Sequence, residues 1–348
     1  MKTFYNQDDI SEIVNNLNIE IKSIKNKNIL LLGYNGFLGK YFVKIFDQII
    51  SDKKINFKVD CYDNYISSSS LNRQKIVNKN KILFHKGNVS NYKFRKKYDV
   101  IIFLAGIASP FIYKKFPLET LSVSYDGVLN LLKKSKKDNS KFIFFSSSEI
   151  YGNPDKKNLP TKESYYGNVN SFGPRSCYDE GKRVGETLCH IFKKYYNCRV
   201  KIIRPFNVFG PLMDKNDYRI IPNIVKKIHS KKNIQIHGDG RQTRTFCYIT
   251  DAITGFMKVI FRKSNNLIYN IGNPNNEISM INLVKCFDNI INKKNKFSLI
   301  SYPNHYPADE PRRRCPDINL AIKDLKYSPK ITVKDGIRRV LKFNKIIQ

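Results

Sequence analysis

The 348-residue sequence is poor in acidic residues, in paired cysteines and in long apolar runs. No two of its seven cysteines have CxxC spacing, which argues against a zinc knuckle or a thioredoxin-like motif, and their odd number argues against a disulfide framework. The longest apolar stretch, residues 100–105, is too short to cross a bilayer. Residues 1–24 lack the apolar centre of a signal peptide. We therefore expect a cytoplasmic protein without a membrane partner, and the scattered histidines predict no metal site.

Basic residues are in large excess. The chain has 62 Lys and Arg against 29 Asp and Glu, a formal charge of +33. The basic residues are mostly lysine and are spread along the chain. This distribution is expected for a solvated surface in a protein whose composition is biased toward Lys, Asn and Ile. The alternative is attraction to an anion such as nucleic acid or a phosphorylated substrate. Proteins that recognise nucleic acids usually rely on arginine, whereas the cations here are mostly lysine, so we expect no nucleic-acid partner.

Strand and helix patterns alternate through the first 205 residues. Apolar runs predict strands at 28–33, 57–62, 82–84, 100–104, 141–145 and 200–203, and helical periodicity is found at 38–50, 118–136 and 178–196. This alternation indicates an α/β fold with a Rossmann-type, doubly wound parallel sheet. Loops are predicted at 67–70 and 151–176. We divide the chain into a polar helical extension (1–26), a mainly Rossmann domain (27–205) and a mainly substrate-binding, smaller lobe (206–348) with segments returning to the Rossmann domain.

A glycine-rich turn follows the first predicted strand and opens a helix. Gly33 would permit the tight turn, Gly36 would let a pyrophosphate approach the backbone, and Gly39 would let the helix pack on the strand. Asp63, at the end of the second strand, suits a ribose 2′-hydroxyl and repels a 2′-phosphate, which favours NAD over NADP. The alternative is a structural glycine turn beside a loop aspartate.

A tyrosine and a lysine four residues apart suggest proton transfer. Tyr178 and Lys182 would share one helix face, and a nearby ammonium is expected to lower the pKa of the phenol. Ser147, at the end of the fifth strand, could share the proton. Standing alone, the pair would more often be an exposed tyrosine and lysine on a surface helix. Asn88, Val89, Leu104 and Ala105 are placed near the cofactor by topology alone. The full set of predicted cofactor contacts is Gly33, Gly36, Phe37, Leu38, Gly39, Asp63, Asn64, Asn88, Val89, Leu104, Ala105, Tyr178 and Lys182.

The order of these motifs resembles the extended short-chain dehydrogenases/reductases, in the NAD-dependent epimerase/dehydratase family. Ser148-Glu149 followed by Tyr151-Gly152, and the segment 173–189, are most similar to UDP-glucuronate decarboxylases (UDP-xylose synthases). The resemblance covers about residues 28–340. The sequence departs from that pattern at Asn88, where the family usually has aspartate, and at Phe103, which leaves room for a neighbouring sugar-nucleotide reaction.

The resemblance implies a mechanism with named residues. Tyr178, helped by Lys182 and Ser147, would deprotonate the C4 hydroxyl of UDP-glucuronate, and the resulting β-keto acid would lose CO₂. Glu149 and Arg244 would manage the C5 proton and the enolate charge. Return of the hydride would give UDP-xylose, and its retention a UDP-4-keto-pentose. The implied substrate contacts are Ser109, Tyr113, Glu149, Asn207, Arg219, Arg241, Arg244 and Arg314.

Several alternatives remain open at this level. The same fold could serve a 4-epimerase, a 4,6-dehydratase or a 4-dehydrogenase acting on another nucleotide sugar. A non-enzymatic nucleic-acid binder would fit the charge but has no need of the Ser147, Tyr178 and Lys182 set. Arg312–Arg314 could be a solvated basic loop, and Asn207 a turn residue. The resemblance also implies a homodimer formed through helices 118–136 and 178–196.

Overall fold

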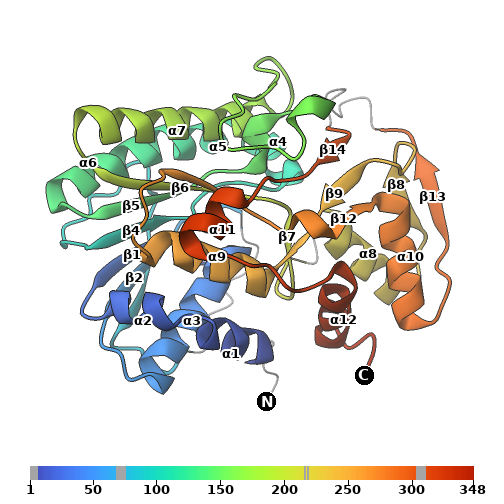
Figure 1. Cartoon of the computed structure of the whole chain (residues 1–348), viewed down its shortest axis with the longest axis horizontal. Helices are drawn as coiled ribbons and strands as arrows, with labels where there is room; N and C mark the ends of the chain where they lie inside the picture. The colour runs from blue at the N-terminus through green and yellow to red at the C-terminus, as the bar shows by residue number, and fades with distance from the viewer. Residues whose placement is uncertain (1–6, 68–75, 215–216, 218, 303–310) are drawn as a thin grey trace.

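A seven-stranded parallel sheet forms the centre of the molecule (Figure 1). The computed structural model describes residues 7–67, 76–214, 217, 219–302 and 311–348. The strand order is β11-β6-β5-β4-β1-β2-β3, so the order reverses between β1 and β4, where ligands bind in such sheets. The predicted Rossmann-type fold is confirmed. The strands are β1 Asn28–Leu32, β2 Lys58–Asp63, β3 Ile82–Lys86, β4 Val100–Phe103, β5 Lys141–Phe145, β6 Arg199–Pro205 and β11 Ile268–Ile271.

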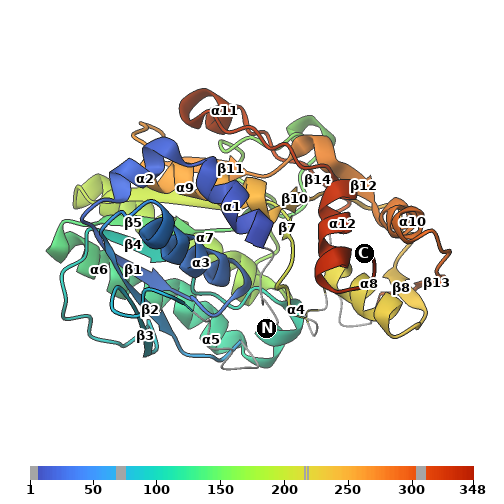
Figure 2. The same cartoon turned by 90° about the horizontal axis from the view of Figure 1, so that it is seen from below.

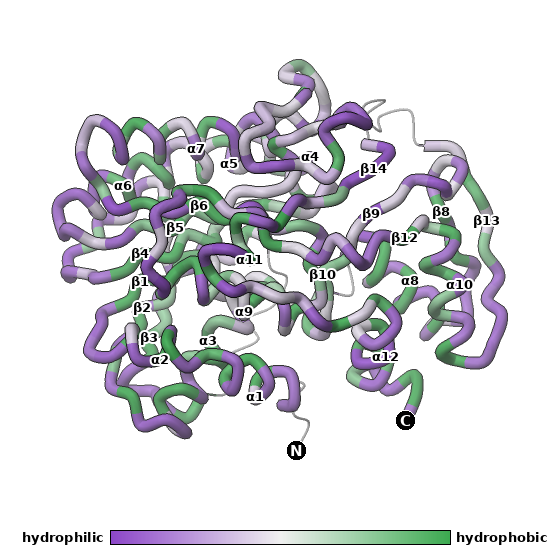
Figure 3. The backbone as a smooth tube through the Cα atoms, in the orientation of Figure 1, coloured by the Kyte–Doolittle hydropathy of each residue, from purple (hydrophilic) through white to green (hydrophobic). Residues whose placement is uncertain are grey.

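Both faces of the sheet are covered by helices. In β1, Ile29 and Leu31 pack into one apolar cluster and Leu30 and Leu32 into another, and all four are fully buried. The first cluster includes α3 (Phe37–Asp52) and α9 (Ile249–Phe261), and the second includes α6 (Val128–Asp138) and α7 (Ser176–Tyr195). This two-sided burial explains why the strand sequences are continuously apolar, as Figure 3 shows.

The predicted helix 118–136 is interrupted in its middle. It consists of α5 (Pro117–Ser122), a π-helical turn (Val123–Gly127) and α6. A Cβ at Gly127 would lie 2.9 Å from the Val89 side chain, so this turn passes unusually close to the loop after β3. A further helix, α4 (Pro110–Lys115), was not expected from the sequence. Of the predicted loop 67–70, positions 68–70 lie outside the described residues.

The N-terminal extension is part of the core. Its helices α1 (Gln7–Asn15) and α2 (Asn18–Ile24) lie along α3 and α9, as Figure 2 shows. Ile13, Leu17 and Ile24 are fully buried. Asp9 is also buried, and its carboxylate accepts hydrogen bonds from Tyr248 Oη at 2.6 Å and Arg339 Nη1 at 2.8 Å. The described part of this extension is helical, as predicted, but its apolar side chains belong to the core, which a polar extension would not supply.

The second lobe is built from small sheets and helices after β6. The pair β8 (Ile234–His237) and β13 (Phe297–Ile300) contacts α8 (Ile220–His229) through β8, and β9 (Thr243–Thr245) lies between β12 (Glu277–Ser279) and β14 (Arg313–Arg314). The chain returns to the main sheet through α9, β11 and α11.

No helix of the described residues is long and apolar enough to cross a membrane, and in the same part of the chain no group of three or more His, Cys, Asp or Glu could hold a metal ion. The remaining elements are the 3₁₀ turns Ser148–Tyr151, Lys156–Asn158 and Pro274–Asn276, and β7 Val208–Phe209, β10 Cys247–Tyr248, α10 Met280–Ile291, α11 Asn319–Leu325 and α12 Val333–Phe343.

Candidate active site

A cavity of about 780 Å³ lies at the carboxyl ends of the central strands, between the sheet and the second lobe. Its wall includes the glycine turn after β1, the end of β5, the first turns of α7 and residues of the second lobe. Sixteen of the predicted site residues line it: Gly33, Gly36, Phe37, Leu38, Gly39, Leu104, Ser109, Tyr113, Ser147, Glu149, Tyr178, Lys182, Asn207, Arg219, Arg244 and Arg314.

The glycine turn has the geometry of a dinucleotide site. Gly33 has φ +83°, and a Cβ there would lie 2.7 Å from the backbone nitrogen of Ala105. A Cβ at Gly39 would clash with the carbonyl oxygen of Gly33. Gly36 is the N-cap of α3 and makes no side-chain cap, so the first N–H groups of the helix begin at the cavity wall. These features fit a pyrophosphate at a helix N-terminus.

Asp63 touches the glycine turn rather than the cavity. Its carboxylate accepts the backbone N–H of Asn35 at 3.0 Å and that of Tyr65 at 2.8 Å. Burial raises the pKa of Asp63, against the effect of these two bonds. The bond to Asn35 ties the end of β2 to the turn after β1, so the acid lies beside the predicted pyrophosphate site.

Five predicted cofactor contacts lie outside the described lining of the cavity. The Asn64 side chain accepts the N–H of Ile66 at 3.1 Å, and that of Asn88 accepts the N–H of Ser90 at 3.2 Å. Val89 and Ala105 pack in or against the apolar cluster below α6 and α7. Local backbone N–H groups donate to the side chains of Asp63, Asn64 and Asn88, and Val89 and Ala105 take part in core packing. The five are Asp63, Asn64, Asn88, Val89 and Ala105.

Tyr178 and Lys182 are buried together in the first turns of α7. Their relative exposures are 7% and 4%, which excludes the surface-helix alternative. Lys182 Nζ lies 5.8 Å from the centre of the Tyr178 ring and donates to the carbonyl oxygen of Phe145 at 2.7 Å. Gly106 makes room for this ammonium, since a Cβ there would be 3.2 Å from Nζ. The helix thus delivers both groups to the end of β5.

Burial dominates the titration of this pair. It raises the pKa of Tyr178 to about 12, although a hydrogen bond with the Ser147 side chain acts in the opposite direction. It lowers the pKa of Lys182 to about 8. The expected lowering of the phenol pKa was therefore wrong, because desolvation outweighs the Ser147 hydrogen bond and the charge of Arg219.

Ser147 is held where it can share a proton with Tyr178. It lies two residues after β5 and forms the N-cap of the turn Ser148–Tyr151, and its Oγ accepts the N–H of Glu149 at 3.2 Å. Both residues line the cavity, so the serine and the glutamate are positioned by one local structure.

Glu149 is bound by two arginines. Arg175 donates to one of its oxygens, and both terminal nitrogens of Arg314 donate to the carboxylate. Arg175 Nε also donates to Asp179 at 3.3 Å. Burial and the charge of Glu149 raise the pKa of Asp179. Arg314, predicted to contact the substrate, lines the cavity and is buried against Glu149, which rules out a solvated basic loop at this position.

Sequence reasoning missed Arg175 as a site residue. It precedes α7 and lies in the segment 173–189 that carried the family resemblance, four residues before Asp179. That spacing places an acid and a base on one helix face, but the second acid, Glu149, is distant in sequence. The residue can be recognised as part of the site only once α7 and the end of β5 are placed together.

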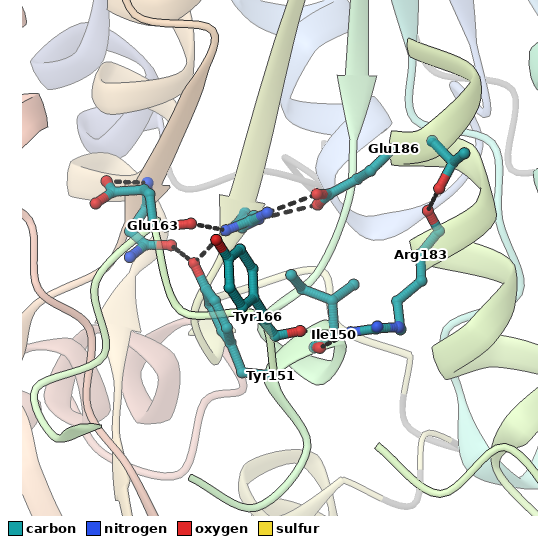
Figure 4. A network of polar contacts seen from close by, with 9 residues as sticks. Ile150, Tyr151, Glu163, Tyr166, Arg183 and Glu186 are labelled. Atoms are coloured by element: carbon teal, nitrogen blue, oxygen red, sulfur yellow. Dashed lines mark hydrogen bonds and ion pairs between the residues drawn. The ribbon is translucent and has the colours of Figure 1, made fainter. Parts of the chain in front are cut away.

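A buried polar network fixes α7 behind the cavity (Figure 4). Arg204 on β6 donates to both carboxylate oxygens of Glu186 on α7, at 2.9 and 2.6 Å. The same guanidinium donates to Tyr151 Oη at 2.6 Å, and Tyr151 donates to Asn270 at 2.8 Å. Arg183, also on α7, donates to the carbonyl oxygen of Ile150 at 3.1 Å. The turn that carries Glu149 is thereby tied to the helix that carries Tyr178.

The second lobe contributes polar groups to the opposite wall. Arg219 is paired with Asp217, and its charge favours the ionised form of Tyr178. Arg244 is buried on β9, and one of its nitrogens donates to the carbonyl oxygen of Thr243 at 2.8 Å. Asn207 lines the cavity, and its buried Nδ2 has no hydrogen-bond partner among the described residues. An amide donor in that situation suits a ligand oxygen.

Arg241 and Ser109 complete the set of predicted substrate contacts. Arg241 is exposed and lies outside the described cavity lining, and its backbone N–H donates to Asp239 at 3.0 Å. Ser109 is the N-cap of α4 and lines the cavity with Tyr113. The Tyr113 ring stacks on Tyr178 with centroids 5.6 Å apart and planes inclined by 13°. The structure therefore brings α4, but not the loop at Arg241, to the reacting end of the cavity.

Comparison with known proteins gives a consistent result. Residues 29–272 match the model of the NAD dependent epimerase/dehydratase family. UDP-glucuronic acid decarboxylase 5 of Arabidopsis thaliana is 34% identical over 312 residues, covering 90% of this chain and 87% of the relative. UDP-glucuronic acid 4-epimerase from Bacillus cereus, solved with UDP-glucuronic acid and NAD, superposes with a TM-score of 0.74 at 25% identity, covering 92% and 99% of the two chains. An epimerase from Methanothermobacter thermautotrophicus has a TM-score of 0.82 at 22% identity, covering 96% and 95%.

Proposed function

Since the chain belongs to the NAD dependent epimerase/dehydratase family, we propose that it decarboxylates UDP-glucuronate to UDP-xylose. The observation that carries this proposal is the presence of Glu149, held by two arginines, in the same cavity wall as Ser147, Tyr178 and Lys182. Relatives of about one-third identity that match 90% of the chain carry the name UDP-glucuronic acid decarboxylase. The cofactor of the family is NAD.

The glycine turn is the proposed site of the cofactor. The backbone of Gly33, Gly36 and the first turn of α3 would hold the pyrophosphate, and Asp63 would accept hydrogen bonds from a ribose. When bound, NAD supplies a reversible acceptor for the hydride at C4 of the sugar. Asn207 and Arg244 are the proposed contacts of the sugar nucleotide in the second lobe.

Proton removal from the C4 hydroxyl is assigned to Tyr178 and Ser147. The phenol must ionise before it can act as a base, and its pKa of about 12 makes this unfavourable without further charge. Lys182 is mostly protonated at pH 7, since its pKa is about 8. The charge of Arg219 favours the phenolate of Tyr178. Ser147 lies between the phenol and the end of β5 and can pass the proton.

Loss of CO₂ follows from the chemistry of the oxidised sugar. A ketone at C4 is β to the carboxylate on C5, so the electrons of the breaking C–C bond can move onto the C4 oxygen as an enolate. C5 then takes up a proton, and reduction at C4 completes the pentose. Glu149 is the proposed group for the C5 proton, and Arg244 is the proposed cation for the enolate charge.

Carboxyl-labelled UDP-glucuronate tests the assignment of Glu149. We expect the purified holoenzyme to release labelled CO₂ and the Glu149→Gln variant to be slower by at least about 100-fold. Glu180→Gln is the matched control, because Glu180 lies on α7 in a half-exposed ion pair with Arg183. NAD binding by each variant verifies the fold. A near-normal rate of CO₂ release by Glu149→Gln would refute the role given to this residue.

Epimerisation of UDP-glucuronate at C4 is the second candidate. The relative from Bacillus cereus named for this reaction has the same fold, and both reactions begin with oxidation at C4. The two are separated by the product, which keeps its carboxylate only in the epimerase reaction.

We also propose that the chain forms a homodimer through α5 and α7. The two helices pack against each other, and Leu118, Leu121 and Tyr125 on the α5 side are 78%, 41% and 45% exposed. A second copy would cover these apolar side chains. Light scattering should give twice the chain mass for the wild type and a monomer for Leu118→Asp, and a wild-type monomer at micromolar concentration would contradict the proposal.

A further inference from the structure

A second and much smaller cavity lies next to Glu149. Its volume is about 10 Å³, which is about the room that one water molecule needs. Glu149 lines both cavities, whereas Asp179 lines the small one and is outside the described lining of the large one. Asn168 and Asn170 in the small cavity's wall are exposed, so this wall extends to the protein surface. Glu149 therefore borders both the proposed sugar site and a small polar space that it shares with Asp179.

One guanidinium joins the two acids of the small cavity. Arg175 donates to Oε2 of Glu149 and, through Nε, to Oδ2 of Asp179 at 3.3 Å. The other oxygen of Asp179, Oδ1, is buried and has no hydrogen-bond partner among the described residues. Such an oxygen is satisfied by a water molecule in the small cavity, to which it donates when it is protonated. The contacts thus leave Asp179 one oxygen that is able to hold a proton.

The surroundings of Asp179 favour its protonated form. Burial raises the pKa of this carboxyl and the negative charge of Glu149 raises it further, whereas the charges of Arg175 and Arg314 act in the opposite direction. The phenol of Tyr178 is the other titratable group in reach, since the charge of Asp179 raises its pKa. When two carboxyl groups share one site, one of them keeps its proton at a pH where an isolated carboxyl is ionised.

The proposed reaction consumes one proton in each turnover. The proton that Tyr178 takes from the C4 hydroxyl returns to the C4 oxygen when the ketone is reduced, so it is not available to C5. The carboxylate leaves as neutral CO₂, and the new C–H bond at C5 therefore needs a proton that comes from water. Glu149, the proposed donor to C5, must receive one proton for every product molecule.

We propose that Asp179 supplies this proton through Glu149. The O–H bond of Asp179 breaks as an O–H bond forms on Glu149, directly or through one water, and Asp179 then takes a proton from water in the small cavity. Glu149 passes the proton to C5, where the electron pair of the enolate forms the C–H bond. The inference rests on the proposed function. Asp179 acts through Glu149 in this relay and does not contact the sugar.

The test follows the first turnover of the NAD-loaded Asp179→Asn variant with excess carboxyl-labelled UDP-glucuronate. Oxidation at C4 and loss of CO₂ precede protonation of C5, so we expect one CO₂ per site to be released at near the wild-type rate. The steady-state rate should then be at least about ten-fold lower than in the wild type, as for loss of a proton-transfer group. Reduced nicotinamide should accumulate, because the hydride returns to C4 only after C5 is protonated, and its absorbance reports this directly.

Two further variants control for changes of charge and structure. Glu180→Gln removes a negative charge from the next residue of α7, which is half-exposed and paired with Arg183, and should behave as the wild type. Asp179→Glu keeps a carboxyl at the position and should recover most of the steady-state rate. NAD binding by each variant verifies the fold. A normal steady-state rate in Asp179→Asn, or a low rate without accumulation of reduced nicotinamide, would overturn the inference, since a purely structural role slows oxidation as well.

Failure of the relay can be told apart from failure of the proposed function. If the wild type decarboxylates UDP-glucuronate and Asp179→Asn turns over normally, only the inference is wrong. If the wild type releases no CO₂, the proposed function is wrong and the inference fails with it.

Discussion

Two glycines of the turn after β1 are expected to fail in different ways when replaced by alanine. At Gly33 the backbone has φ +83°, and an added Cβ would lie 2.7 Å from the nitrogen of Ala105. Strained φ and overpacking together should lower the free energy of unfolding by about 2 to 5 kcal/mol. At Gly36 the φ is −70° and the nearest atom to an added Cβ, the carbonyl oxygen of Gly33, is 3.4 Å away. Gly36→Ala should therefore keep the stability within about 0.5 kcal/mol.

For NAD binding we expect the larger effect at Gly36, where the effect on stability is small. In Gly36→Ala the added methyl group would lie at the cavity wall where the pyrophosphate must approach the backbone. NAD should therefore bind at least about 30-fold more weakly, a loss of about 2 kcal/mol in binding free energy. Urea unfolding measures the first effect and calorimetric titration with NAD measures the second. Normal NAD affinity in Gly36→Ala would refute the placement of the pyrophosphate, and normal stability in Gly33→Ala would refute the geometry of the turn.

Three further predictions concern buried polar groups. Arg204→Met should cost about 3 kcal/mol in urea unfolding because it leaves the Glu186 carboxylate buried without its guanidinium, and a loss below 1 kcal/mol would contradict this. Asp9→Ala should lower the free energy of unfolding by about 2 to 4 kcal/mol, since Tyr248 loses its acceptor, whereas a dispensable extension would show no change in melting temperature. Burial raises the pKa of Asp251 to about 6, so the folded state binds the carboxyl proton of Asp251 more tightly than the unfolded state does. The protonated carboxyl therefore stabilises the fold at low pH, and this contribution is lost as the pH rises from about 4 to about 6. Between these pH values the free energy of unfolding should fall by up to about 3 kcal/mol less in Asp251→Asn than in the wild type. Parallel curves of unfolding free energy against pH for the two proteins would refute this.

The central sheet and the glycine turn could be predicted because their signals are local. A buried parallel strand needs a continuous apolar run, and Gly33 and Gly39 are required by contacts with neighbouring backbone. Tyr178 and Lys182 were found for the same reason, since a spacing of four residues on one helix decides their common face.

The surroundings of Glu149 could not be predicted from local patterns. Arg314 reaches it from the end of the chain and Arg175 from the start of α7, and neither distance in sequence indicates a contact. The pKa of Tyr178 was misjudged because the sequence shows the neighbouring lysine but not the burial that opposes it.

The N-terminal extension was misread for a different reason. Ile10, Ile13, Val14 and Leu17 recur at helical spacing and are all buried, so the apolar face was present in the sequence. What the spacing does not reveal is the surface that covers it, which α3 and α9 provide together only after the sheet has formed.

The most direct test of the central claim is mass spectrometry of the nucleotide sugars after incubation of the purified protein with UDP-glucuronate, with and without added NAD. Decarboxylation predicts a product lighter by CO₂, with the mass of a UDP-pentose if the hydride returns to C4 and of a UDP-4-keto-pentose if it does not. Unchanged UDP-glucuronate, or an isomer of the same mass, from folded protein with bound NAD would contradict the account.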